Sequence, residues 1–77
     1  MNLLDYEDEI KSLEMKGWIL SEFNSDKAKW VKSNRTIDLY YEEGEFNAEL
    51  YKNDRNSSSI RGGDIDEVLD SISEKFK

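Results

Sequence analysis

Residues 35–52 read RTIDLYYEEGEFNAELYK, and this stretch decides the fold. Its apolar and polar residues alternate, as in strands with one buried face. Glu43 and Gly44 form a predicted two-residue turn at its centre, since glycine adopts positive φ at no steric cost. That turn brings three apolar pairs into register: Tyr41 with Phe46, Leu39 with Ala48, and Ile37 with Leu50. Turn and pattern therefore agree on a β-hairpin over residues 35–42 and 45–52.

Two more strands are predicted before the hairpin, over residues 18–24 and 27–33. Turns at Ser25-Asp26 and Ser33-Asn34 place apolar residues opposite one another: Phe23 with Ala28, Ala28 with Leu39, and Trp30 with Ile37. On the other face a row of charged residues crosses the four strands: Glu22, Lys29, Asp38 and Glu49. Lys29 offsets the repulsion between Asp38 and Glu49, which supports this register.

Amphipathic helices are expected on both sides of the strands. Apolar residues recur at helical spacing in two segments: Leu3, Tyr6, Ile10 and Leu13, then Ile65, Val68, Leu69, Ile72 and Phe76. Asn2 and Asp64 are the expected N-caps, and Gly17 ends the first helix. Residues 53–63, NDRNSSSIRGG, are interpreted as a loop because they are rich in Asn, Ser and Gly.

These elements predict one small acidic α+β domain over residues 1–77, in the order α-β-β-β-β-α. The four strands form an antiparallel meander, and both helices pack on one face of it, because the two helices and the sheet must share their apolar surfaces.

The chain has no cysteine and no histidine among its 77 residues. This excludes disulfides, thiolate nucleophiles and Ser–His or Cys–His relays. We expect no catalytic residue, no cofactor and no metal site, and a chain this short leaves little volume for an active-site pocket. The sequence therefore favours a protein that is not an enzyme.

Eighteen acidic and eleven basic residues give a net charge of −7, which disfavours binding to nucleic acid and to anionic membranes. The basic segment 27–35, KAKWVKSNR, resembles a single-strand binding groove in composition, but Trp30 lies on the core face of the predicted sheet. The longest apolar run, Trp18-Ile19-Leu20, is far too short to span a membrane. Residues 1–10 lack the features of a signal peptide, so a cytoplasmic location is expected.

The sheet face without helices is the first candidate site. In the predicted register it carries an aromatic and aliphatic group: Trp18, Leu20, Val31, Tyr40 and Tyr51. Aromatic anchors surrounded by charge are typical of protein interfaces. The first hypothesis is therefore a protein-interaction module that binds another protein or a second copy of itself. The competing interpretations are that a helix covers this face, or that a bulge in the first strand turns Trp18 and Leu20 inward.

The acidic surface is the second candidate. Its carboxylates lie at the hairpin tip and on the last helix: Glu42, Glu43, Glu45, Asp66 and Asp70. Carboxylates spaced like phosphates imitate a nucleic-acid backbone, so the alternative hypothesis is an inhibitor of a DNA- or RNA-binding protein. Solvated helix faces and the helix dipole explain the same residues without a partner.

Residues with AT-rich codons, such as Lys, Asn and Ile, outnumber those with GC-rich codons. In size, acidity and lack of cofactor chemistry the chain resembles small accessory proteins of phages and prophages. That resemblance implies a bacterial or phage source and a host protein as partner. A subunit of a larger assembly is a third possibility.

Overall fold

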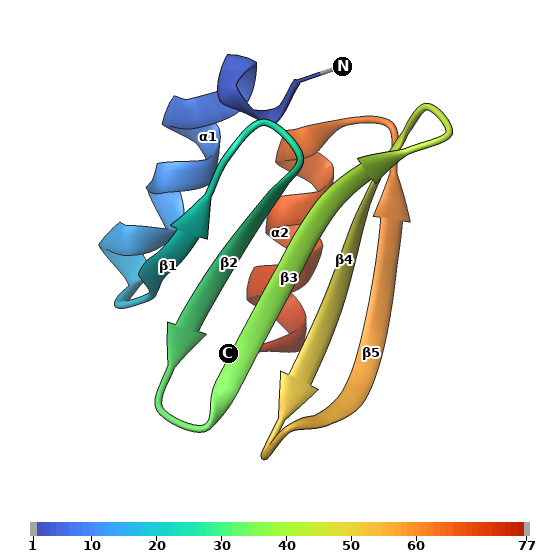
Figure 1. The fold of residues 1–77 in the computed structure, drawn as a ribbon. Coiled ribbons are helices and arrows are strands. Elements are labelled where there is room, and N and C mark those ends of the chain that lie inside the picture. The colour runs from blue at the N-terminus through green and yellow to red at the C-terminus, as the bar shows by residue number, and fades with distance from the viewer. Residues whose placement is uncertain (1, 77) are drawn as a thin grey trace.

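The computed structural model describes residues 2–76, in which one sheet is covered on one side by helical segments (Figure 1). The elements in chain order are η1 (Leu3–Tyr6), α1 (Glu7–Lys11), η2 (Ser12–Lys16), β1 (Ile19–Phe23), β2 (Lys27–Lys32), β3 (Arg35–Glu42), β4 (Glu45–Lys52), β5 (Arg55–Gly62) and α2 (Ile65–Lys75). Here η denotes a 3₁₀ helix. The five strands follow one another in the sheet in chain order, and all neighbours are antiparallel. The α+β class is confirmed, but the sheet has five strands where four were predicted.

The additional strand, β5, lies in residues 53–63, so the prediction of a loop there is wrong. Asn53 and Asp54 have φ of 54° and 64° and form a tight two-residue turn. β5 then pairs with β4, with Ile60 opposite Ala48 and Gly62 opposite Phe46. Its composition is polar, because of its inward residues Ser58, Ile60 and Gly62 only Ile60 is a large apolar residue, so hydrophobicity does not identify it as a strand.

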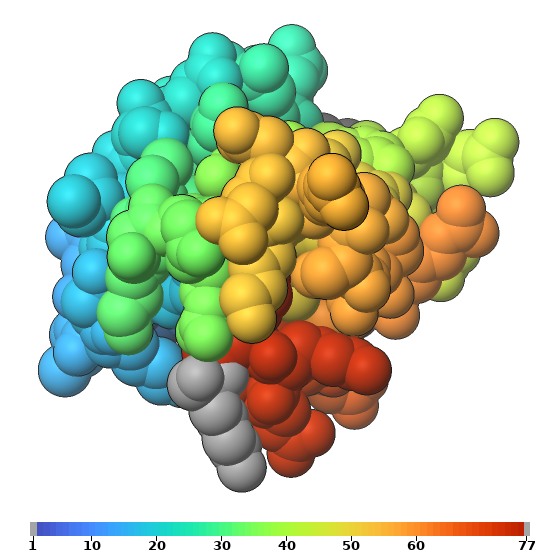
Figure 2. Space-filling view, turned by 90° about the horizontal axis from the view of Figure 1, so that it is seen from below, coloured from blue at the N-terminus to red at the C-terminus, as the bar shows by residue number. Residues whose placement is uncertain are grey.

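The registers predicted from the turns are confirmed. Tyr41 lies opposite Phe46, and Trp30 lies opposite Ile37. Glu43 and Gly44 form the β3–β4 turn with φ of 53° and 80°. At the other end of the sheet the β2–β3 and β4–β5 turns lie side by side (Figure 2), and the Asn53 amide donates to the Asn34 carbonyl at 2.9 Å.

β1 departs from the predicted register through a bulge. Leu20 lies opposite Trp30 and Glu22 opposite Lys29, so Ser21 is the extra residue. The bulge reverses the side-chain alternation before Ser21 and turns Trp18 and Leu20 toward the helices. Trp18 is only 4% exposed, whereas Ile19 is 67% exposed. The prediction that Trp18 and Leu20 lie on the open face is therefore wrong.

The N-terminal helical segment spans residues 3–16 as predicted, but only Glu7–Lys11 is α-helical. Its inward residues include two pairs at a spacing of three, the buried Leu3 with the half-buried Tyr6 and the buried Ile10 with the buried Leu13, which suits the tighter 3₁₀ turn. Asn2 caps it by accepting from the Leu4 amide at 2.8 Å. Gly17 ends it with a φ of 92°.

The core lies between the sheet and the helical layer. Its fully buried residues come from the N-terminal helical segment, from β2, β3, β4 and α2, and from the residue just before β1: Leu3, Ile10, Leu13, Trp18, Ala28, Trp30, Ile37, Leu39, Phe46, Ala48, Leu50, Ile65, Val68, Leu69 and Ile72. Leu20, Phe23 and Ile60 from the two edge strands pack against this group. All inward positions of β2, β3 and β4 are thus used for packing, which leaves their outward positions for other roles.

Replacing Asp64 by alanine is expected to lower the free energy of unfolding by about 1 kcal/mol, because its carboxylate caps α2. The Asp64 side chain accepts a hydrogen bond from the Asp66 amide at 2.8 Å. Urea unfolding measures the change. Asp70→Ala removes the same charge from the exposed middle of α2 and is the control; equal losses in the two variants would contradict the capping role.

Candidate functional site

One face of the sheet is left open because the N-terminal helical segment and α2 both pack on the other face (Figure 1). Val31, Tyr40 and Tyr51 lie on this open face, each half-buried between its neighbours. Ile19 joins them opposite Val31, in the place that the sequence assigned to Trp18 and Leu20. A role in partner binding stays a prediction for Val31, Tyr40 and Tyr51.

A row of polar residues crosses the middle of the open face. In register it consists of Glu22, Lys29, Asp38, Glu49 and Ser59. Glu22 forms its ion pair with Lys27 at 3.2 Å. Within residues 2–76, neither the ammonium of Lys29 nor the carboxylate of Asp38 forms an ion pair or a side-chain hydrogen bond, although both side chains are half-buried. These two charges are therefore open to an external partner.

Glu49, by contrast, is held by three donors. Its carboxylate accepts from the Ser59 hydroxyl at 2.5 Å, the Asn56 amide at 3.1 Å and the Tyr40 hydroxyl at 3.5 Å. Burial raises the pKa of Tyr40, and the nearby Glu49 and Glu42 carboxylates raise it further. Tyr40 thus keeps its proton at neutral pH and remains a donor to Glu49.

The two tyrosines border a groove in the open face. A hollow of about 610 Å³ is lined by Lys29, Asp38, Tyr40, Glu49 and Tyr51, and also by Asp26, Lys27 and Leu39. A second hollow of about 220 Å³ continues it past Lys29, Asp38 and Tyr51 toward Thr36 and Asp54. We call Lys29, Asp38, Tyr40, Glu49 and Tyr51 the tyrosine groove. Tyr40 lies opposite Asn47 and Tyr51 is four residues further along β4, so the two backbones are separated by roughly 13 Å along the strands.

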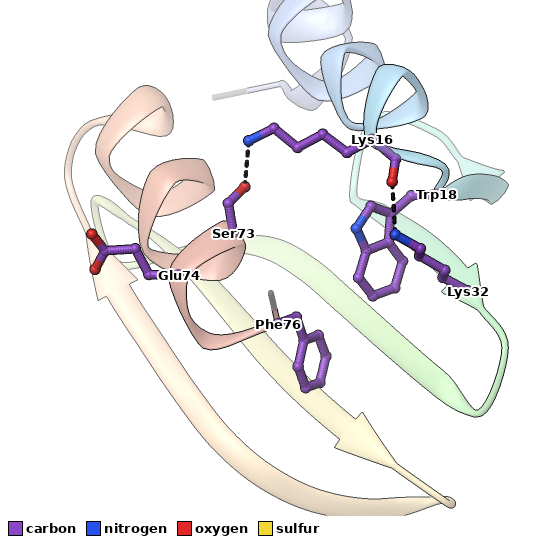
Figure 3. Close-up of a pocket in the computed structure, with 6 residues that line it drawn as sticks. All are labelled: Lys16, Trp18, Lys32, Ser73, Glu74 and Phe76. Atoms are coloured by element: carbon purple, nitrogen blue, oxygen red, sulfur yellow. Dashed lines mark hydrogen bonds between the residues drawn. The ribbon is translucent and has the colours of Figure 1, made fainter.

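Another hollow, of about 350 Å³, lies where α2 ends over β1 and β2 (Figure 3). The rings of Trp18 and Phe76 stack there with centroids 5.8 Å apart. Lys32 lies over the Trp18 ring at 5.8 Å and donates to the Lys16 carbonyl at 2.8 Å. Lys16 in turn donates to the Ser73 hydroxyl at 2.8 Å. These contacts join η2, β2 and α2, so we interpret this group as a structural clasp.

Asp70 lies in the middle of α2, but the other four acidic residues of the second hypothesis lie at the opposite end of the molecule. The β3–β4 turn and the first turn of α2 lie at this end (Figure 1). All five carboxylates are exposed: Glu42, Glu43, Glu45, Asp66 and Asp70. Glu42 and Glu45 lie directly opposite each other, which is an unfavourable pair of like charges.

Sequence reasoning missed the residues that β5 and the bulge bring to the open face. Ile19 was not among the residues placed on the open face, and Asn56 and Ser59 were placed in a loop. The available signal for β5 was the two-residue Asn53-Asp54 turn that follows the predicted hairpin.

Among residues 2–76 no group of acidic side chains has the arrangement of a metal site. None of the helices in this part of the chain is long and apolar enough to cross a membrane. No protein-family model, curated protein or solved structure matches the chain.

Proposed function

We propose that this protein is a small, non-enzymatic interaction module that binds another protein through the tyrosine groove. The observation that carries the proposal is the open sheet face, on which Tyr40 and Tyr51 flank the unpaired charges of Lys29 and Asp38. Tyrosine is enriched in protein interfaces because its ring supplies contact area at a small cost in entropy. Half-buried charged groups that lack a hydrogen-bond or ion-pair partner are stabilised when a bound protein supplies one.

The shape of the groove favours a protein segment over a small substrate. It consists of two neighbouring surface hollows over β2, β3 and β4, which share Lys29, Asp38 and Tyr51 in their linings. Its tyrosine rings, ammonium and carboxylates are groups that commonly form contacts in protein interfaces. The chain has no histidine or cysteine that could act as a catalytic base or nucleophile. A second copy of the chain remains one of the partners that this surface suits.

The test is affinity capture from a lysate of the source organism with the wild type and with Tyr40→Ala/Tyr51→Ala. A partner that depends on the groove is expected to bind the variant at least about 30-fold more weakly, because central aromatic anchors contribute 2 kcal/mol or more. The matched control is Leu4→Ala/Met15→Ala, which removes two exposed apolar side chains from the helical layer. Equal capture by all three proteins would overturn the proposal, and circular dichroism confirms that each variant is folded.

The nucleic-acid mimic is the second proposal, and the opposed pair Glu42 and Glu45 favours it. A cationic protein surface would relieve the repulsion in that pair. Binding of this kind is expected to weaken steeply with added salt and to be lost in Glu43→Lys/Glu45→Lys. Binding that survives high salt and depends on Tyr40 and Tyr51 would favour the tyrosine groove instead.

The biological source and the location in the cell are proposed from the amino-acid composition. Amino-acid usage and size agree with a bacterial or phage accessory protein. The absence of cysteine agrees with a cytoplasmic location. A host protein would then be the partner.

A further inference from the structure

We propose that the tyrosine groove receives an arginine side chain of the partner, with the guanidinium on the carboxylate of Asp38. This inference rests on the proposed function and names the chemistry of the partner. It follows from three properties of the groove: its unbalanced charge, the free carboxylate of Asp38 between the two tyrosines, and its tyrosine walls.

The groove has an excess of negative charge. Its lining includes the carboxylates of Asp26, Asp38 and Glu49 and the ammonium groups of Lys27 and Lys29. Lys27 is already paired with Glu22 at 3.2 Å. Among the lining residues this leaves three carboxylates against one remaining ammonium, that of Lys29. The Arg61 guanidinium lies opposite Asn47, outside this lining, although its charge reaches Tyr40. A cation from outside is therefore attracted to the groove and an anion is repelled.

Asp38 is the carboxylate that such a cation would reach. Glu49 lies directly opposite it in the sheet, which is an unfavourable pair of like charges. Three donors already occupy Glu49. Asp38 accepts no side-chain hydrogen bond from residues 2–76, and Lys29 opposite it forms no ion pair with it. An external donor at Asp38 would both satisfy its oxygens and reduce the repulsion from Glu49.

The walls favour arginine over lysine. A guanidinium is planar, binds a carboxylate through two parallel hydrogen bonds and stacks on aromatic rings, whereas an ammonium is a more strongly hydrated point charge. Tyr40 and Tyr51 border the floor on either side, about 13 Å apart along the strands. The hollow of about 610 Å³ is large enough for one long side chain and the backbone that carries it.

The test uses three peptides that differ at one position: acetyl-Gly-Arg-Gly-amide, its lysine analogue and its citrulline analogue, which is neutral and close to arginine in shape. Each is titrated into ¹⁵N-labelled protein, and amide shifts are followed in β2, β3 and β4. We expect the arginine peptide to bind most tightly, the lysine peptide several-fold more weakly, and the citrulline peptide to cause no saturable shifts. If no peptide binds, or if citrulline equals arginine, the inference is wrong.

Two variants with the same change in net charge locate the site. Asp38→Asn is expected to weaken binding of the arginine peptide at least 10-fold, since charge-assisted hydrogen bonds contribute about 1.5–3 kcal/mol. Asp66→Asn on exposed α2 is expected to change it less than 2-fold, because screening removes most long-range attraction. Equal losses in both variants would mean that the peptide responds only to overall charge, and would overturn the inference.

The captured partner separates the inference from the proposed function. If Asp38→Asn still captures the partner and Tyr40→Ala/Tyr51→Ala does not, the arginine contact is wrong and the interaction module stands. If the double tyrosine variant still captures the partner, the proposed function is wrong as well.

Discussion

Replacing Trp18 by alanine is expected to unfold a large fraction of the protein. Trp18 is 4% exposed, stacks on Phe76 with ring centroids 5.8 Å apart, and lies under the ammonium of Lys32. Removing a buried tryptophan costs about 3–5 kcal/mol, because burial is lost and a cavity is left behind. A single core in a chain this short rarely provides more than about 3–5 kcal/mol of stability. The substitution therefore removes most of the free energy of unfolding.

Thermal unfolding followed by circular dichroism measures this effect, and Ile19→Ala is the matched control. Ile19 is the next residue along the chain but is 67% exposed, so its loss is expected to change stability by less than about 0.5 kcal/mol. If Trp18→Ala melted like the wild type and Ile19→Ala were the unstable variant, β1 would have the regular register without its bulge.

The run Trp18-Ile19-Leu20 explains why sequence reasoning misplaced these residues. Three consecutive apolar residues satisfy either phase of the alternation, so the pattern does not decide which of them faces the core. The extra residue Ser21 then reverses the phase relative to Phe23. A bulge of this kind is stabilised by packing against the helices, which is a tertiary effect that local propensity does not encode.

Residues 35–52 were predictable for the opposite reason. The turn at Glu43 and Gly44 and the apolar alternation on both sides independently require the same pairing, and a slip of one residue would turn every apolar side chain outward. That agreement also placed Tyr40 and Tyr51 on the open face. All five residues of the tyrosine groove could thus be placed on the open face from sequence, because four of them belong to this hairpin and Lys29 is in register with Asp38.

The contribution of β5 to the groove was not predictable from hydrophobicity. Asn56 and Ser59 hold Glu49, yet both lie in a segment whose composition is typical of a loop. An edge strand has a neighbour on one side only, so fewer of its residues are buried and the apolar signal is weak. The turn chemistry at Asn53 and Asp54 was the stronger indicator.

Inserting one glycine between Ser58 and Ser59 is therefore expected to destabilise the protein by at least about 2 kcal/mol. If β5 were a loop, an insertion would cost only a few tenths of a kcal/mol. In a strand it shifts the phase, which moves Ile60 away from its position opposite Ala48. Ile60 is half-buried, so the loss of its packing costs about 1 kcal/mol, and the broken pairing of β5 with β4 adds to this cost. For a domain of this size the melting temperature is expected to fall by roughly 8–16 °C.

The same glycine inserted after Gly63 is the control, since Gly63 is exposed and lies between β5 and α2 with open space around it. That insertion is expected to be tolerated.

The two insertions also separate folding from binding. The insertion in β5 displaces Ser59, so Glu49 loses one hydrogen-bond donor. Because Tyr40 donates to the same carboxylate, its position in the groove is weakened. Loss of arginine-peptide binding in the β5 insertion, at a temperature where both proteins are folded, would show that the edge strand supports the groove. Similar melting temperatures and similar peptide binding in the two insertions would mean that residues 55–62 do not act as a strand in solution.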